Sequence, residues 1–381
     1  MTKILYVAPR YHTNQVPIVE YLIRKGHKVQ FWVARKEHTE DYSILSPIVC
    51  PMDSIFNKIF NWRSKTFNEI QKENYLQAKF TPSIVWTYRN LISYHPDIVI
   101  VRDHNILSMV VCVFSKIIGI KNIIQYTQSP CSCKPSEYPN IAKRMIWRLL
   151  YTHKEFSPVN VRVSNNEYID CKNPGRYYIP FAMCYDENVM KRTYLMNSKV
   201  RILDVGKYRE YKNHFVLIRA LSLLPTSVLM NLHVTIVGQA SKTEEVDYFN
   251  RLDFFVQSCR LDSYVTLLRN IPYSNMNELY LDNDVFVLTS KCEVASISIL
   301  EAMSNGMVTI STNHNGTASY IPKKFGYTFE SDDESSLANV LTRVIYEKNN
   351  ICQKGLATFE YAKRHYNPEI YWESMKKLCK I

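Results

Sequence analysis

Two lysines in the second half of the sequence have the spacing of a site for an anionic ligand. Lys207 and Lys212 lie five residues apart after Gly206, in a turn that we predict to precede a helix at 213–224. Ammonium groups and the N–H groups at a helix N-terminus both attract negative charge, so this segment suits a diphosphate. A solvated charged turn is the alternative interpretation of the same residues.

Two glutamates follow further along the chain. Glu293 and Glu301 are eight residues apart, on either side of an elbow between a predicted strand at 285–288 and a predicted helix at 297–303. The carboxyl end of a strand and the opening of the next helix are where α/β sheets bind ligands. The pair could act as general acid and base or could accept hydrogen bonds from sugar hydroxyls. Ser298 and Glu301 also fit a capping box, which would make Glu301 a helix cap.

Asp282-Asn283-Asp284, directly before the same strand, resembles an Asp-x-Asp metal clamp. A turn stabilised by the short polar side chains is the alternative that we favour, because an apolar strand follows at once.

Strand and helix patterns alternate in both halves of the chain. In the second half we predict strands at 200–205, 232–237, 265–268, 285–288 and 307–310, with helices between them. The first half opens with a strand at 4–8, a helix at 15–25 and a strand at 29–34. The connecting loop, residues 9–14, contains no glycine, which disfavours a dinucleotide-binding turn. The predicted fold class is therefore α/β, with two Rossmann-like domains in series.

The first half also has polar residues where its predicted strands end. Asp103 and His104 follow a strand at 97–101, and Gln128 follows a strand at 122–126. With Asn14 in the first loop, they are candidate contacts for an acceptor substrate, although each could equally be a cap or a solvated loop residue. We expect 161–164 to be the last strand of this domain.

Charge and cysteine content narrow the class of protein. The net charge is +12, and most of it comes from residues 1–190, which hold 24 Lys and Arg against 15 Asp and Glu. This bias suits an anionic membrane or nucleic acid, but no nucleic-acid-binding signature accompanies it. The ten cysteines form no CxxC pair, which favours reduced thiols. No signal peptide or membrane span is evident, so we expect a cytoplasmic protein or one that is peripheral to the cytoplasmic face of a membrane.

Two basic aromatic stretches are relevant to a membrane. One lies within 50–92 and contains Ile55, Ile59 and Trp62 among lysines and arginines; the other is 141–151. Each could contact lipid headgroups or pack on its own domain.

Together, the Gly206–Lys212 segment, the Val237-Gly238-Gln239 turn, the 265–272 segment and the Glu-x7-Glu motif resemble glycosyltransferase family 4, the retaining glycosyltransferases of GT-B fold. The resemblance covers 202–345 and is weaker in the first half. Three positions depart from the family pattern. Lys207 replaces the usual arginine, the first loop lacks the usual glycine pair, and Gln128 stands where many members have histidine.

The resemblance implies a role for each matching residue. Glu301 would hold the nucleotide ribose, and Glu293 would bind the donor sugar. Lys207 and Lys212 would neutralise the leaving diphosphate, which makes them, with Glu293, the expected catalytic residues. The remaining expected donor contacts are Gly206, Gly238, the backbone of Asn270 and Ile271 at the base, and the backbone of Ala295, Ser296 and Ile297. No metal and no cofactor is expected.

The resemblance also implies an organisation and an activity. We expect an acceptor-binding domain at 1–190 and a nucleotide-sugar-binding domain at 191–360 that face each other across a cleft, and a C-terminal helix at 361–381 that packs back towards the first domain. The expected reaction moves a sugar, with retention, from a UDP-sugar to a hydroxyl of a glycan or lipid-linked glycan. A nucleotide-sugar epimerase, a sugar phosphorylase and a catalytically silent glycan or nucleotide binder are the alternatives. Nucleic acid is not an expected partner.

Overall fold

The computed structural model describes residues 1–36, 40–67, 71–72, 75–76, 79–102, 105–128, 141, 154–164, 167–170 and 176–381. It divides into two compact units. Unit 1 comprises 1–158, 171–182 and 368–381, and unit 2 comprises 159–170 and 183–367. In the described part of the chain, no helix has the length and apolar content needed to cross a membrane.

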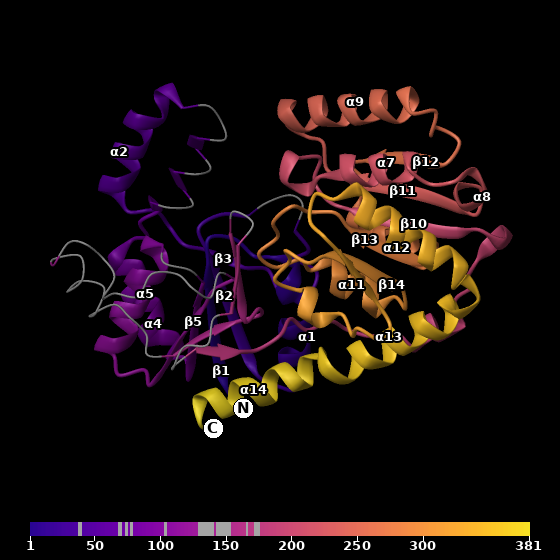
Figure 1. Cartoon of the computed structure of the whole chain (residues 1–381). Coiled ribbons are helices and arrows are strands. Elements are labelled where there is room, and N and C mark those ends of the chain that lie inside the picture. The colour runs from indigo at the N-terminus through magenta and orange to yellow at the C-terminus, as the bar shows by residue number, and fades with distance from the viewer. Residues whose placement is uncertain are drawn as a thin grey trace. The chain divides into compact units, whose positions relative to one another are not determined.

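Unit 1 is built on a seven-stranded sheet in the order β3-β2-β1-β4-β5-β6-β9 (Figure 1). The strands are β1 Lys3–Ala8, β2 Lys28–Val33, β3 Ile48–Val49, β4 Ile98–Arg102, β5 Asn122–Tyr126, β6 Glu155–Ser157 and β9 Arg176–Tyr178. All six pairings are parallel. The predicted last strand at 161–164 is wrong for this sheet, because β7 Val161–Ser164 pairs antiparallel with β8 Glu167–Asp170 in a separate ribbon.

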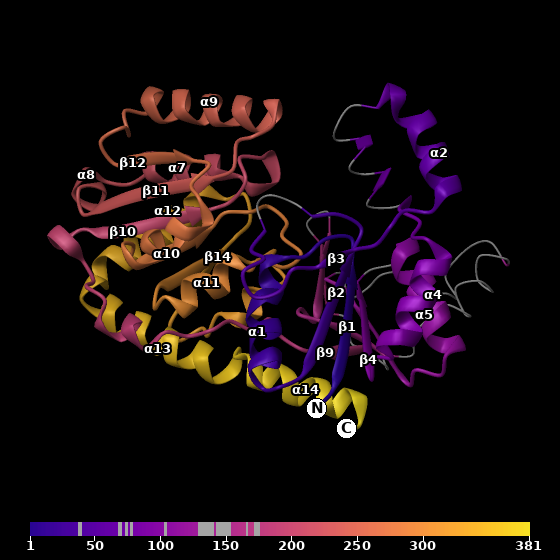
Figure 2. The ribbon, with the colours of Figure 1, turned by 180° about the vertical axis from the view of Figure 1, so that it is seen from behind.

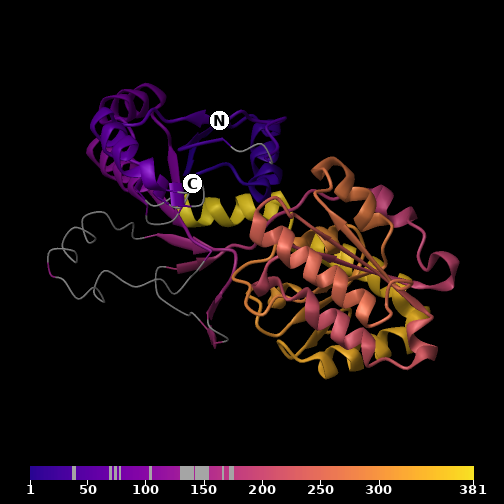
Figure 3. The same cartoon turned by 90° about the horizontal axis from the view of Figure 1, so that it is seen from above.

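Helices cover both faces of this sheet, as the alternation of side chains along β1 requires. Ile4 and Tyr6 pack in a core with α1 Val16–Arg24 and α14 Pro368–Cys379, whereas Leu5 and Val7 pack in a core with α4 Ile84–Tyr94 and α5 Ile106–Ile117. Figure 3 shows α14, in yellow, beside the N-terminal strands of this unit. The remaining helical segments of the unit are η1 Thr13–Gln15, α2 Ser54–Arg63 and η2 Ser64–Thr66.

Unit 2 is built on a six-stranded parallel sheet in the order β12-β11-β10-β13-β14-β15. The strands are β10 Val200–Val205, β11 Leu232–Gly238, β12 Val265–Arg269, β13 Val285–Leu288, β14 Val308–Thr312 and β15 Tyr327–Phe329. Numbered within the sheet this order is 3-2-1-4-5-6, the doubly wound Rossmann order. The prediction of two Rossmann-like α/β domains is therefore confirmed.

Helices also cover both faces of the unit 2 sheet (Figure 2). On one face α7 His214–Ser222, α9 Thr243–Ser258 and α12 Glu334–Tyr346 share a core with the strands, and on the other α11 Ser298–Ser304 and α13 Ile351–His365 pack together over β14. The shorter helices are α8 Thr226–Leu229, α10 Tyr273–Leu281, η4 Glu187–Lys191, η5 Met196–Ser198, η6 Glu210–Lys212, η7 Ala318–Tyr320 and η8 Lys348–Asn350.

Candidate functional site

The candidate donor site lies where the strand order of unit 2 reverses. β10 is the first strand of the sheet in sequence, and it has β11 on one side and β13 on the other. The helices that follow β10 and β13 leave on opposite faces, so the loops after these strands open a crevice at the carboxyl edge. Residues 206–213 form the first loop and 289–297 form the second, and both lysines and Glu293 fall within them.

The predicted lysine pair occupies two different environments. Lys207 is exposed, whereas the side chain of Lys212 is only 12% exposed. A Cβ atom at Gly206 would lie 3.1 Å from Cδ of Lys212, so the Lys212 side chain packs closely over this glycine. The turn therefore brings the aliphatic part of Lys212 against the backbone at the end of β10 and leaves Lys207 at the surface.

Lys212 and Glu293 form an ion pair across the two loops, although they are 81 residues apart in the chain. The Glu293 side chain is 16% exposed, and its Oε2 also accepts a hydrogen bond from Ser290 Oγ at 3.2 Å. Burial is the largest influence on Lys212 and opposes its charged form, but Glu293, Tyr211 and Asp204 together outweigh burial, and the pKa of Lys212 is raised above its ordinary value. A fixed positive charge is thus held at the switch point.

A buried polar group under the first loop supports this arrangement. His214 Nδ1 lies 3.0 Å from Asp204 Oδ2, and both residues are buried. Thr289 Oγ1 lies 2.9 Å from the same carboxylate oxygen and 2.7 Å from the Lys212 carbonyl oxygen. Sequence reasoning missed these residues, although an aspartate inside the apolar strand 200–205 is a signal that could have found them, because buried carboxylates need partners.

The second loop is fixed by neighbouring backbone. Glu293 pairs with Asn315 in an isolated parallel bridge, and the Gly316 N–H donates to the Glu293 carbonyl oxygen at 3.0 Å. The Ser296 N–H donates to Thr317 Oγ1 at 3.2 Å, so this one of the three predicted backbone contacts already has a partner. Ala295 and Ile297 flank it and are partly buried.

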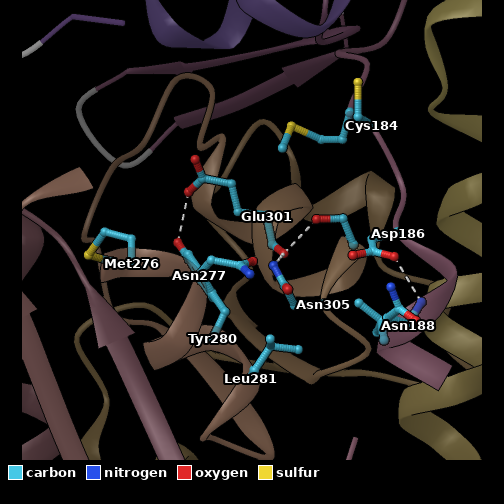
Figure 4. Close-up of a pocket in the computed structure, with 12 residues that line it drawn as sticks. Cys184, Asp186, Asn188, Met276, Asn277, Tyr280, Leu281, Glu301 and Asn305 are labelled. Carbon is cyan, nitrogen blue, oxygen red and sulfur yellow. Dashed lines mark hydrogen bonds between the residues drawn. The ribbon is translucent and has the colours of Figure 1, made fainter. Parts of the chain in front are cut away.

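Glu301 lies in a pocket of its own in unit 2. The cavity measures about 240 Å³ and is lined by residues of α10, α11 and the segment 183–189. Tyr280 donates a hydrogen bond from its hydroxyl to Glu301 Oε2 at 2.7 Å (Figure 4). Burial raises the pKa of Glu301, and the Tyr280 hydrogen bond opposes that effect. The helix-cap alternative is wrong, because α11 starts after Ile297 without a side-chain cap.

The other predicted donor contacts lie at the ends of β11 and β12. Gly238 approaches the first loop closely, since a Cβ atom there would lie 2.1 Å from the Gly206 carbonyl oxygen. Asn270 has a left-handed backbone with φ of 57°, and its side chain pairs with both backbone groups of Ala240, at 2.9 and 3.2 Å. Ile271 follows and is partly buried. Contact of these residues with a base stays a prediction.

The Asp282-Asn283-Asp284 segment forms the end of α10 and the entry to β13. Asp284 is buried, is paired with Arg201 at 3.1 Å and accepts hydrogen bonds from the N–H groups of Leu195 and Arg201 at 3.1 and 2.9 Å. These contacts give its carboxylate a structural role at the start of the sheet.

Two of the four acceptor-side candidates are described, both in unit 1. Gln128 accepts a hydrogen bond from Arg102 at 3.1 Å, and Asn14 lies in η1 after the first loop. Asp103 and His104, like the predicted helix from 142 onwards, lie outside the described residues.

Comparison with known proteins now identifies the family. Residues 187–363 match the family model described as glycosyl transferases group 1, and this range contains all of the site residues in unit 2. This segment, which makes up most of unit 2, belongs to the family. Membership of glycosyl transferases group 1, a hexosyltransferase family, confirms the resemblance stated from the sequence.

The chain is also similar to a curated protein, mannosylfructose-phosphate synthase from Agrobacterium fabrum (strain C58 / ATCC 33970). It is 28% identical over 116 residues, which are 30% of this chain and 26% of that relative. The match therefore spans about a quarter of the relative's length.

Solved glycosyltransferase structures resemble the whole chain. A glycosyltransferase from Rickettsia africae ESF-5 matches with a TM-score of 0.70 at 15% identity, covering 100% of this chain and 98% of that chain. Anabaena Alr3699/HepE in complex with UDP matches with a TM-score of 0.69 at 12% identity, covering 100% of both chains. At these identities the likeness shows the fold alone, and it confirms the predicted GT-B fold class.

Proposed function

We propose that this chain transfers a hexosyl group from a UDP-sugar to a hydroxyl of a glycan or lipid-linked glycan, with retention at the anomeric carbon. The observation that carries the proposal is the Lys212–Glu293 ion pair at the switch point of unit 2, beside Gly206. A group 1 family match over the same residues and the solved complexes of Anabaena Alr3699/HepE with UDP and UDP-glucose support a nucleotide-sugar donor.

The chemistry follows from the charges at this site. The bond between the anomeric carbon and the diphosphate breaks, and the diphosphate leaves with the electron pair. The oxygen of the acceptor hydroxyl bonds to the anomeric carbon, and its proton passes to the departing phosphate oxygen. Lys212 then faces growing negative charge, and stabilisation that is stronger in the transition state than in the ground state is what raises the rate. Lys207 adds a second, exposed ammonium group to the same loop.

Glu293 would hold the sugar by accepting hydrogen bonds from its hydroxyl groups, and its charge would keep Lys212 protonated. Glu301 would accept the ribose hydroxyls from within its own cavity, with Tyr280 orienting the carboxylate. The two glutamates thus divide the donor between them, and neither is needed as a proton-transfer group.

A thermal-shift and product assay tests the proposal. A UDP-sugar should raise the melting temperature by mass action, and GDP- and ADP-sugars should not. With a competent acceptor, one UDP should be released for each sugar transferred, which an epimerase or a phosphorylase would not give. Stabilisation by GDP- or ADP-sugars would overturn the choice of base, and no stabilisation by any of the three would overturn the donor site.

A lipid-linked acceptor is supported by α2 in unit 1. Ile55, Ile59 and Trp62 lie on one stripe of this helix and are 69%, 44% and 70% exposed, while Phe56 and Phe60 stack on Tyr75. Lys58, Arg63 and Lys65 are exposed on and after the same helix. An exposed apolar stripe flanked by basic residues is the pattern of a helix that lies at a membrane surface.

Sedimentation with vesicles tests this surface. The protein should sediment with vesicles that contain anionic phospholipid, and the double variant Ile59→Ser/Trp62→Ser should lose most of that binding. Phe254→Ser is the matched control, because Phe254 is 73% exposed in unit 2, outside the α2 stripe. Equal binding of the double variant and the wild type would exclude α2 as the docking surface.

A further inference from the structure

The sheet of unit 1 has a switch point of its own, and three arginines are gathered there. β1 lies between β2 and β4, as β10 lies between β11 and β13 in unit 2. Arg10 follows β1 by two residues, Arg35 follows β2 by two residues, and Arg102 is the last residue of β4. In a parallel sheet these positions share the carboxyl edge, which is where a ligand would bind.

Backbone hydrogen bonds fix the first two of these arginines side by side. The N–H groups of Ala34 and Arg35 both donate to the Pro9 carbonyl oxygen, at 3.1 and 3.2 Å. The loop after β2 is therefore fastened to the loop after β1. Arg102 lies on the other side of β1, because Val7 of β1 is in register with Val101 of β4.

Arg102 is held in a defined position although it carries a charge. Only 8% of the residue is exposed. Its guanidinium carbon lies 5.5 Å from the centre of the Tyr126 ring, and its Nη2 donates to Gln128 Oε1 at 3.1 Å. Gln128 in turn donates to the Tyr126 hydroxyl at 3.3 Å. A guanidinium fixed in this way is preorganised to pair with two oxygens of an oxyanion, because little side-chain freedom remains to be lost on binding.

His12 lies in the loop after β1, within electrostatic reach of the three arginines. Burial and then the positive charges of Arg102, Arg10 and Arg35 lower the pKa of His12 to about 2. Its imidazole is therefore neutral at every pH at which an enzyme of this kind works, and a neutral imidazole can donate one hydrogen bond. The charged groups that lower this pKa are all arginines.

Two further features complete the site. Arg10 forms an ion pair with Glu40 at 3.5 Å, and the Glu40 side chain is 3% exposed. The Asn14 amide oxygen is buried without a hydrogen-bond partner in the described structure. Turning this amide over would present its two N–H donors instead.

We propose that the cluster of Arg10, His12, Arg35 and Arg102 at the switch point of unit 1 binds a phosphate group carried by the acceptor substrate. Calling the ligand an acceptor rests on the proposed glycosyl transfer, whereas the phosphate chemistry rests on the cluster alone. Arginine pairs with phosphate through two parallel N–H···O bonds, which lysine cannot match. The phosphate can belong to a soluble sugar phosphate or to a lipid-linked sugar diphosphate.

Calorimetric titration of the full chain tests the cluster without relying on transfer. Inorganic phosphate, glucose 6-phosphate, glucose and a polyprenyl diphosphate hexose in detergent micelles are the four probes. Glucose 6-phosphate should bind and glucose should not, if the source is a sugar phosphate. Preference for the lipid diphosphate over glucose 6-phosphate assigns the lipid-linked source, and failure of all three phosphorylated probes to bind overturns the proposal.

Substitutions then locate the binding. Arg102→Lys keeps the positive charge and removes the planar fork of N–H donors. Arg35→Gln removes a charge from a less buried position, so this second variant replaces the first in the test if Arg102→Lys folds poorly. Each should weaken phosphate binding by about 10- to 100-fold, the range of a lost charge-assisted hydrogen bond. Arg24→Gln is the matched control, because Arg24 is 77% exposed at the end of α1. Unchanged binding in both cluster variants would overturn the assignment.

A donor measurement separates this proposal from the proposed function. UDP-sugar binding to unit 2 should be the same in wild type and in both cluster variants. Phosphate binding without UDP-sugar binding would leave the cluster standing and overturn the transfer reaction. UDP-sugar binding with no phosphate binding would overturn the phosphate site in unit 1 and leave the transfer reaction standing.

Discussion

Replacing Glu293 with glutamine removes the negative charge next to Lys212 and keeps nearly the same shape. Removing one partner of a buried ion pair costs about 3–5 kcal/mol of folding free energy. Both side chains keep a little exposure, 12% for Lys212 and 16% for Glu293, so we expect the low end of that range, about 3 kcal/mol. For a domain of this size the loss corresponds to a melting temperature lower by roughly 6–12 °C.

The double variant Lys212→Met/Glu293→Gln separates stability from catalysis. Replacing both partners of a buried pair is often nearly neutral, so the double variant should recover to within about 1 kcal/mol of wild type. The coupling energy of the cycle should then be at least ~2 kcal/mol. Transfer activity should be lost in both single variants, Glu293→Gln and Lys212→Met, and in the double variant. In each of them the charge that receives the diphosphate is absent or no longer held in place.

Urea unfolding measures the stabilities, and release of UDP measures the activity. The raised pKa of Lys212 means that its stabilisation is complete below its ordinary value of 10.5 and is lost only as the pH rises through the higher folded value. The cycle should therefore give the same coupling from about pH 6 to 8. Additive stability losses would refute the ion pair, and a fully active double variant would refute its catalytic role.

Three other predictions concern the same unit. Glu301→Gln should weaken UDP binding at neutral pH yet raise the melting temperature slightly. A carboxyl group whose pKa is raised by burial destabilises the fold as the pH rises above its ordinary pKa of 4.5, and the substitution removes that effect. Thermal shift with and without UDP measures both effects, and a lower melting temperature without UDP would contradict the buried charge. Gly316→Ala would place a Cβ atom 2.0 Å from the Val294 carbonyl oxygen and should cost about 1–3 kcal/mol while it displaces Glu293; unchanged donor affinity would contradict this coupling. A chelator should leave the transfer rate unchanged, and a strict requirement for a divalent cation would show that the diphosphate charge is neutralised by metal.

The fold was predictable because buried parallel strands are nearly continuous apolar runs. The predicted strands at 122–126, 200–205 and 285–288 coincide with β5, β10 and β13. The apolar pattern between the predicted strands at 232–237 and 265–268 predicts a helix only from Tyr248, whereas α9 begins at Thr243. The pattern misses the start of α9 because the first turn of this helix is acidic and polar and carries no apolar period. β15 is only three residues long, too short for any periodic signal.

The candidate site was predictable in its residues and less so in its contacts. The Glu-x7-Glu spacing and the two lysines come from motifs that are local in sequence. That Lys212 pairs with Glu293 while Lys207 stays exposed depends on the register of β10 beside β13, where Ile202 pairs with Val285. The Tyr280–Glu301 hydrogen bond likewise joins two helices through tertiary packing. No spacing rule reports such contacts.

The switch point of unit 2 carries lysine and that of unit 1 carries arginine, and this difference fits the two proposed ligands. A departing diphosphate gains additional negative charge during the reaction. The side chain that stabilises this added charge should therefore be a point charge that another residue neutralises before the reaction, as Glu293 does for Lys212. A phosphate that marks an acceptor carries its charge throughout, so a rigid fork such as Arg102 suits it better. Under the two proposals, the same strand order serves transition-state stabilisation in unit 2 and ground-state recognition in unit 1. If so, Arg102→Lys should raise the KM for a phosphorylated acceptor and leave kcat nearly unchanged, whereas Lys212→Met should lower kcat.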